Sequence, residues 1–187
     1  EDFGEGEFFT GGFTVRATID EEMQIEAAQS LQGQLEKYDR GRGLWRGTGE
    51  VIPLDQLTSE DDWRAALADI KVSRDVDLDG KWHPAVVLEI GDKDARIGIE
   101  DVPDDDDGHW IVAKDVQWAR KVRADGTRGN KARVAGDLLT VGEVVLVRAM
   151  TKDEDGAFIR WTLRQVPEVQ GGFVAMDVNT GRVLAMQ

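Results

Sequence analysis

The sequence has 187 residues, 41% of them hydrophobic, no cysteine and a formal net charge of −14. This length suits one domain with appendages or two small domains. The missing cysteines exclude disulfide bonds, thiolate zinc sites and cysteine catalysis, and the negative charge argues against general affinity for nucleic acid. No apolar run approaches the roughly 20 residues that span a bilayer. Because the sequence starts at Glu1 without a signal-like segment, we expect an excised piece of a longer protein.

The N-terminal part predicts one strand and two helices. Residues 12–19 alternate between apolar and polar side chains, as in a half-buried strand. Asp20 can cap a following helix, in which apolar residues recur every four positions and which should end near Tyr38. A second helix is predicted to begin at Ser59, with Asp62 at the capping-box position where Glu or Gln is usual. Its expected inward side chains are Trp63, Ala66, Leu67 and Ile70.

From Pro84 onward the pattern is dominated by strands. Short apolar or alternating runs separated by Gly/Asp turns predict strands at residues 84–90, 94–99, 109–113, 116–118, 143–150 and 157–163. The predicted fold class is therefore mainly β with some helix, built on a small closed or partly open barrel. We favour a barrel of the oligonucleotide/oligosaccharide-binding (OB) type, with a small sandwich as the alternative.

Four tryptophans fall at or beside predicted strands. Indole side chains in a small barrel usually fill the core, because each buries a large apolar area while its N–H finds one partner. Core filling is therefore the preferred interpretation, and a stacking platform for bases or sugars is the alternative. The four residues are Trp82, Trp110, Trp118 and Trp161.

A basic segment interrupts the acidic sequence between Arg120 and Arg133. It carries six cations against one acid, Asp125. We expect a solvated loop here, because Gly126 and Gly129 break any periodic pattern. The alternative is a docking site for an anionic partner. The six basic residues are Arg120, Lys121, Arg123, Arg128, Lys131 and Arg133.

One segment resembles the start of a calcium loop. Asp75, Asp77 and Asp79 alternate before Gly80, so that their carboxylates could converge on one ion. The twelfth position, which should be a bidentate Glu, is Val86. An Asp/Gly-rich turn is therefore preferred over a metal site, and no metal or other cofactor is expected.

No catalytic constellation can be nominated from the sequence. A serine acyl-transfer site needs Ser-x-x-Lys and a Lys-Thr-Gly strand, and the turn at residues 179–181 shares only the last two letters of the second motif. The glycine-rich residues 41–49 lack the Gly-Lys-Ser/Thr ending of a phosphate-binding loop. His83 and His109 are far apart in the sequence, and no carboxylate pair is distinctive. We therefore expect no catalytic residue.

The C-terminal residues predict a β-hairpin that needs cover. Two apolar runs, residues 173–178 and 182–186, are joined by Asn179-Thr180-Gly181, which favours a tight turn. Both faces of these runs are apolar, which is typical of strands inside a sheet that is packed on both sides. We expect the covering elements to belong to a larger fold.

Both ends of the chain resemble class A penicillin-binding proteins. The segment "GGFTVRATIDEEMQIEAAQSLQGQLEKYD", residues 11–39, is similar to the stretch that precedes their transpeptidase domain. The segment "WTLRQVPEVQGGFVAMDVNTGRVLAM", residues 161–186, is similar to the stretch that opens that domain. The most specific letters are the Gln-x-Pro-x-Val-Gln-Gly run at 165–171 and Thr180-Gly181. Some family members, chiefly from Gram-negative bacteria, carry an inserted OB-type barrel between these two segments.

The resemblance implies a domain organisation and an absence of catalysis. Residues 1–44 would be a linker strand and helix, residues 45–165 the inserted OB-like domain, and residues 166–187 the first hairpin of an incomplete transpeptidase domain. The family makes peptidoglycan with a glycosyltransferase and with a transpeptidase whose acyl-serine penicillin traps. By this alignment neither active site lies in the chain, so no catalytic or cofactor-binding residue is carried over.

The expected function is that of a non-catalytic accessory or regulatory part of a peptidoglycan synthase. The resemblance implies the periplasmic side of the bacterial inner membrane, with membrane contact only through an N-terminal anchor outside this sequence. The expected partners are the remainder of the synthase and a regulatory lipoprotein or peptidoglycan, with the basic segment as contact region and no nucleic acid. The alternatives are a free-standing OB module for nucleic acid or oligosaccharide, and an independent enzyme that penicillin would label.

Overall fold

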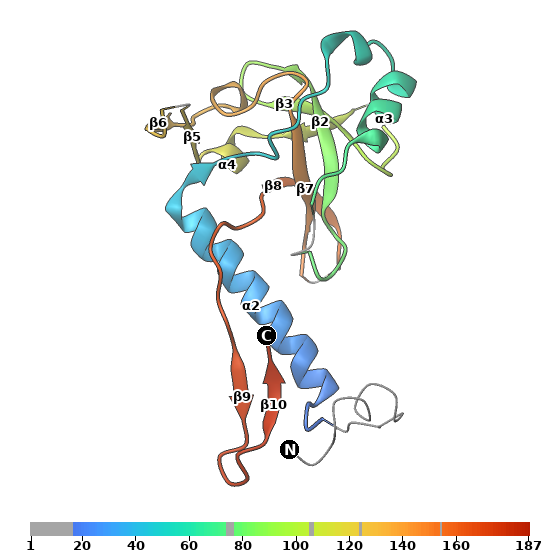
Figure 1. Cartoon of the computed structure of the whole chain (residues 1–187). Coiled ribbons are helices and arrows are strands. Elements are labelled where there is room, and N and C mark those ends of the chain that lie inside the picture. Colours follow the sequence, from blue (N-terminus) through green and yellow to red (C-terminus); the bar gives the residue numbers. More distant parts are fainter. Residues whose placement is uncertain (1–16, 74–76, 105–106, 124, 154) are drawn as a thin grey trace, which may run out of the picture. The chain divides into compact units, whose positions relative to one another are not determined.

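The structure, a computed structural model, describes residues 17–73, 77–104, 107–123, 125–153 and 155–187. The chain forms two compact units (Figure 1). The hairpin unit contains the described residues up to Leu31 together with Gly171–Gln187. The barrel unit contains Gln32–Gln170. Helix α2, Glu21–Arg42, begins in the first unit and ends in the second.

The start of α2 confirms the predicted cap. The carboxylate of Asp20 accepts a 3.0 Å hydrogen bond from the backbone N–H of Met23, which satisfies one of the free donors of the first turn. The helix runs four residues beyond its predicted end near Tyr38 and stops before Gly43, whose φ of +68° favours glycine. Of the strand predicted at 12–19, only residues 17–19 are described, and they form no strand.

The predicted C-terminal hairpin is present. Strand β9 (Val174–Met176) pairs antiparallel with β10 (Val183–Met186). Its turn is held by the Asp177 carboxylate, which accepts hydrogen bonds of 2.8 and 2.9 Å from the backbone N–H groups of Asn179 and Thr180. Ala185 is buried, whereas Val178 is 94% exposed. Most large apolar side chains of this hairpin thus lack cover within the hairpin unit.

The barrel unit contains a nearly closed five-stranded antiparallel sheet with the order β4-β3-β2-β7-β8 (Figure 1). This confirms the predicted fold class and the OB-like barrel. The strands are β2 (His83–Ile90), β3 (Ala95–Ile99), β4 (His109–Ile111), β7 (Val144–Thr151) and β8 (Phe158–Arg164). Each lies within a few residues of a run whose apolar or alternating pattern predicted it.

Three shorter strands form a second sheet beside the barrel. Strand β1 (Leu44–Trp45) pairs parallel with β5 (Arg120–Val122), and β5 pairs antiparallel with β6 (Arg128–Lys131). The loop predicted between Arg120 and Arg133 is therefore wrong. The strand predicted at residues 116–118 is also wrong, because the chain forms the one-turn helix α4 (Ala113–Val116) there. Its Asp115 is buried and pairs with Arg160 on β8, 2.8 Å away, which favours the turn over an extended strand.

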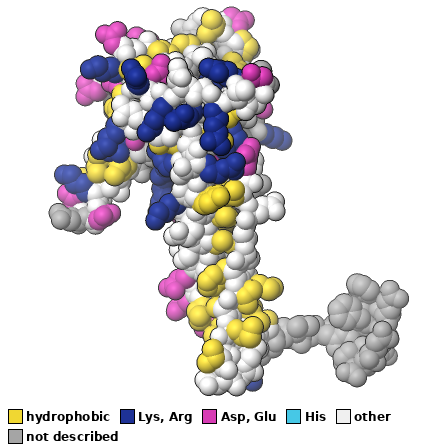
Figure 2. All heavy atoms as spheres, turned by 90° about the vertical axis from the view of Figure 1, so that its left-hand side faces the viewer, with side chains coloured by type: hydrophobic (Ala, Val, Ile, Leu, Met, Phe, Trp, Pro, Cys, Tyr) yellow, Lys and Arg dark blue, Asp and Glu magenta, His cyan; other side chains and the backbone are white. Residues whose placement is uncertain are grey.

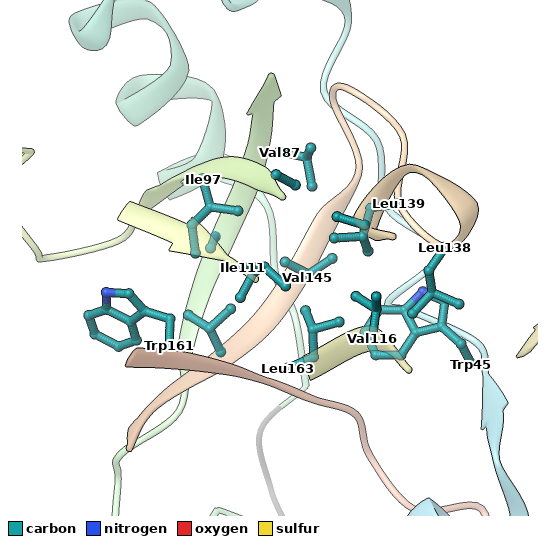
Figure 3. Close-up of a cluster of buried hydrophobic side chains, with 14 of the residues drawn as sticks. Trp45, Val87, Ile97, Ile111, Val116, Leu138, Leu139, Val145, Trp161 and Leu163 are labelled. Atoms are coloured by element: carbon teal, nitrogen blue, oxygen red, sulfur yellow. The ribbon is translucent and has the colours of Figure 1, made fainter. Parts of the chain in front are cut away.

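The main hydrophobic core lies between the barrel strands and the segments that connect them (Figure 3). Trp161 and Trp45 lie at opposite ends of this cluster. The side chains of Trp82 and Trp161 are buried, which confirms core filling for these two, whereas Trp110 and Trp118 are half-buried. The short 3₁₀ helix η2 (Ala135–Asp137) contributes Ala135 and leads into two more core residues, Leu138 and Leu139.

A second core joins helix α3 (Glu60–Asp69) to strands β2 and β7. Ser59 caps α3 as predicted, with its hydroxyl oxygen 3.2 Å from the backbone nitrogen of Asp62. Trp63 and Leu67 pack inward beside Ile52, which precedes the short 3₁₀ helix η1 (Leu54–Gln56). A Cβ at Gly98 on β3 would lie 2.7 Å from the Trp63 ring, so only glycine fits under this indole.

Candidate basic docking site

Strands β5 and β6 form a hairpin whose ends are tied to the rest of the barrel unit. The Arg120 N–H donates to Gly43 O at 2.9 Å, and the Ala132 N–H donates to Ala119 O at 2.9 Å. At the tip, the Asp125 carboxylate accepts hydrogen bonds from the hydroxyl and the backbone N–H of Thr127, and both bonds lower the pKa of Asp125. The described residues of this hairpin therefore form paired strands where the sequence predicts a loop.

Two glycines that the sequence suggests as loop residues are required by the geometry of this hairpin. Gly126 has a φ of +78° at the tip, in the left-handed region that glycine enters at no steric cost. A Cβ at Gly129 would lie 3.0 Å from the backbone oxygen of Lys121 on the facing strand. These residues therefore mark a turn and a close strand contact.

All six basic residues of the predicted docking segment are exposed. Four of them line a groove of about 1130 Å³, together with Val122, Ala132 and Asp137 among others. These four, which define the basic groove, are Lys121, Arg123, Lys131 and Arg133. Arg120 and Arg128 lie on the same hairpin outside the groove. Figure 2 shows Lys and Arg side chains gathered on the face of the barrel unit that it displays.

The charges of this segment are only partly offset within the described part of the chain, where Asp137 interacts electrostatically with Arg133. None of the six basic residues forms an ion pair with another described residue. Asp137, in the groove wall, accepts hydrogen bonds of 2.8 and 3.2 Å from the backbone N–H groups of Arg133 and Val134, which lower its pKa. Exposed, unpaired cations of this kind attract an anionic surface, with a range limited to about 8 Å at physiological salt.

The calcium-loop residues are not gathered into a described metal site. Asp75 lies outside the described residues. Asp77 accepts a 2.8 Å hydrogen bond from the backbone N–H of Trp82, while Asp79 pairs with Lys81 at 3.1 Å and with Arg148 at 2.9 Å. Burial raises the pKa of Asp77. Within the described ranges, no group of three His, Cys, Asp or Glu side chains could hold a metal ion.

A buried polar cluster near the end of α2 was not predicted from the sequence. The Asp39 carboxylate, Arg46 and the Gln165 side-chain amide bond one another, and Gln165 Nε2 also donates to Leu44 O at 2.8 Å. Gln165 belongs to the Gln-x-Pro run of the resemblance, which is the only available signal. Asp39 gives no such signal, because it is one acid among many polar residues of its helix.

Arg40, beside this cluster, packs against the half-buried Trp118. Its guanidinium lies 4.3 Å from the ring centroid and donates a 3.0 Å hydrogen bond to Leu163 O. Burial, with the nearby charge of Arg164, lowers the pKa of Arg40 to about 10. Arg40 thus joins α2 to β8 within the barrel unit.

A family model described as the penicillin-binding protein OB-like domain matches residues 45–169. The chain belongs to this family. It is 29% identical over its whole length to penicillin-binding protein 1A of Vibrio cholerae, of which it spans 21%, and 32% identical over 96% of its length to the Rickettsia felis protein of that name, of which it spans 19%. The chain thus spans about a fifth of the curated relatives it matches.

A solved structure shows the same fold. The crystal structure of penicillin-binding protein 1A from Haemophilus influenzae superposes with a TM-score of 0.59 at 21% identity, covering 99% of this chain and 23% of that one. Together these matches confirm the resemblance to class A penicillin-binding proteins, and they do not favour a free-standing module. Among the described residues, no helix has both the length and the hydrophobicity needed to cross a membrane.

Proposed function

We propose that this chain is a non-catalytic accessory region of a peptidoglycan synthase. The observation that carries this proposal is the family match across the barrel, flanked by segments that also align with penicillin-binding protein 1A. In the proposed parent protein, a glycosyltransferase polymerises glycan strands and a serine transpeptidase cross-links their peptides. The parent would act on the periplasmic side of the inner membrane, held by an anchor outside this sequence.

The catalytic assignment is tested by labelling with fluorescent penicillin. We expect the chain to stay unlabelled and the parent protein to be labelled, because acylation needs a nucleophilic serine with a neighbouring base. A parent protein from which residues 45–165 are removed should still be labelled. Covalent labelling of the chain itself would contradict the proposal.

The role we assign to the basic groove is docking of an anionic partner, for which the acidic face of a regulatory lipoprotein is the preferred candidate. The four groove cations form no ion pair with a described residue, and the groove wall holds one acid, Asp137, against the four of them, so a partner would supply most of the opposite charge. Electrostatic docking of this kind raises the association rate and weakens with salt. The carboxylates of peptidoglycan stem peptides are the alternative source of charge.

Matched variants of the hairpin test this role in the parent protein. Lys121→Ser with Lys131→Ser removes two groove cations, whereas Arg120→Ser with Arg128→Ser removes two cations of the same hairpin that lie outside the groove. We expect the first pair to weaken lipoprotein binding at least tenfold at low salt and the second pair to change it less than threefold. An equal loss of binding affinity in both variants would show that the net charge of the hairpin, and not the groove, determines lipoprotein binding.

The nucleic-acid alternative has a direct test in a salt titration with single-stranded DNA. The net charge of −14 opposes binding to a polyanion. We expect no binding at 50 mM salt. An association constant whose logarithm falls linearly with the logarithm of the salt concentration would support nucleic-acid binding instead.

A further inference from the structure

A second pocket lies where the two edge strands of the barrel meet. Strands β4 and β8 end the five-stranded sheet and lie side by side without pairing to each other. The pocket beside them has a volume of about 420 Å³, within the range of roughly 300–1,000 Å³ typical of small-molecule sites. The residues that define this aromatic pocket are Asp107, His109, Trp110, Phe158, Arg160 and Trp161.

The rings of the aromatic pocket are held in place by hydrogen bonds to the protein. The Trp161 indole N–H lies 3.4 Å from His109 Nδ1, and His109 Nε2 lies 2.9 Å from Pro103 O, so one histidine tautomer satisfies both contacts. The Trp110 indole N–H donates to Asp107 O at 2.8 Å. Because these N–H groups are used, the half-buried Trp110 offers a ligand its ring and no donor, while the buried Trp161 lies against Phe158.

The most exposed ring of the pocket is Phe158. Its side chain is 56% exposed, although its ring centroid is only 5.6 Å from that of Trp161. Its neighbour Ile159 is 41% exposed. A solvent-facing phenyl ring supported by a buried indole is a stacking surface that does not need to rearrange when a ligand arrives.

The polar groups at the pocket include one acid and one base. Arg160 Nε donates to the buried carboxylate of Asp115 at 2.8 Å, which fixes the guanidinium plane. Its Nη groups make no hydrogen bond to another described residue. Asp107, another lining residue, is exposed. A ligand can therefore accept from Arg160 and donate to Asp107 while it covers the rings.

We propose that the aromatic pocket binds a short stretch of an uncharged oligosaccharide. The C–H face of a pyranose ring packs against Phe158 and Trp110, because these hydrogens carry partial positive charge and aromatic faces are negative. Its hydroxyl or acetamido groups bond Asp107 and Arg160. A purely apolar peptide would bury the Asp107 carboxylate and the Nη groups of Arg160 without hydrogen-bond partners, which is costly. Binding of oligosaccharides near strand ends and loops is known for barrels of this type.

The identity of the oligosaccharide rests on the proposed function, whereas the inference that the pocket binds a sugar rests on the side chains of the pocket alone. A peptidoglycan synthase handles a glycan of alternating amino sugars, so a glycan strand is the occupant that this function supplies. The pocket would then hold a sugar segment beside the barrel without taking part in bond formation.

The test titrates the full chain with the neutral tetramer of N-acetylglucosamine and follows tryptophan fluorescence and NMR shifts of the indole N–H groups. We expect saturable binding with a Kd below about 1 mM, and shifts at Trp110 and Trp161. Phe158→Ala should weaken binding about tenfold, the effect of roughly one stacking contact. The control is Leu54→Ala, an apolar side chain 67% exposed elsewhere on the barrel unit, which should leave Kd unchanged.

Three results would overturn the proposal. They are no shift up to 10 mM sugar, equal affinity of the Phe158→Ala variant, and saturable binding of a proline-rich peptide in place of the sugar. Asp107→Asn gives a second test of sugar affinity. It keeps the fold and the pocket size but weakens the hydrogen bond to a sugar hydroxyl, so we expect Kd to rise. Penicillin labelling of the parent protein reports separately on the proposed function, so the failure of one proposal is distinguishable from the failure of the other.

Discussion

The carboxylate of Asp39 and the guanidinium of Arg46 form a buried ion pair, with 2.6 Å between Oδ2 and Nη2. Gln165 Nε2 donates to the same carboxylate oxygen at 2.7 Å, and Gln165 Oε1 accepts from the backbone N–H of Arg46 at 3.1 Å. The three side chains therefore join the end of α2, the segment after β1 and the end of β8 within the barrel unit.

Replacing one member of this pair should be strongly destabilising. Asp39→Asn keeps the size of the side chain but leaves the partly exposed Arg46 with only the exposed Glu168, 3.3 Å away, as a counter-charge, and we expect the free energy of unfolding to fall by about 2–3 kcal/mol. Urea unfolding followed by circular dichroism measures this. The control is Glu60→Gln, which breaks the more exposed pair with Arg64 and should cost less than about 1 kcal/mol. Similar losses in both variants would show that Asp39 contributes no more than a surface pair.

Gly98→Ala should destabilise the contact between α3 and the barrel. The new Cβ would lie 2.7 Å from the Trp63 ring, so the indole must shift, at a cost of about 1–3 kcal/mol. The matched control is Gly33→Ala in α2, where no atom lies within 4 Å and the gain in helix propensity should stabilise by up to about 1 kcal/mol. In the double variant Trp63→Leu with Gly98→Ala, the two costs should be less than additive.

The cap of α3 should weaken in acid. Hydrogen bonds from the hydroxyls of Thr58 and Ser59 lower the pKa of Asp62 below its ordinary value in the unfolded chain. The ionised Asp62 carboxylate therefore contributes fully to stability when the pH is above the pKa of the unfolded chain. This contribution is lost as the pH falls through the lower pKa of the folded chain. NMR titration of the carboxyl carbon should show a midpoint below about 3.9. In the Thr58→Ala variant the midpoint should rise, and an unchanged midpoint would contradict the assigned cause.

The groove cations should be dispensable for stability. Because Lys121 and Lys131 have no described ionic partner, Lys121→Ser and Lys131→Ser should each change the free energy of unfolding by no more than about 0.5 kcal/mol. Thermal unfolding of the chain measures this directly. A loss above 2 kcal/mol would show that these lysines support the hairpin, and that weakened partner binding could not be assigned to the groove.

The elements that follow from local patterns could be predicted from the sequence. The start of α3 at Ser59, with Trp63 and Leu67 turned inward, needs only a cap and a helical period. The five barrel strands stand out because each apolar run must find cover. The β5–β6 hairpin was missed for a physical reason, since its pairing partner is β1, far away in the sequence, and its glycines look like loop residues until the strand contact at Gly129 is known.

The candidate sites divide in the same way. The six basic residues could be identified as a cluster, but only the folded hairpin and the segment after it show which four line the groove. The interpretation of the tryptophans as core residues is confirmed for Trp82 and Trp161. The pocket beside Phe158 could not be predicted, because it depends on β4 and β8 meeting at the closing edge of the barrel.

The sequence by itself determined the β-rich class, the caps, the turns and the similarity of both ends to one family, because these depend on neighbouring residues and on the order of apolar side chains. Only the tertiary structure decided that Asp39 is buried, that four cations share one groove and that four aromatic rings line one pocket. Such groupings arise when distant segments pack together, and no spacing along the chain records which side chains then become neighbours.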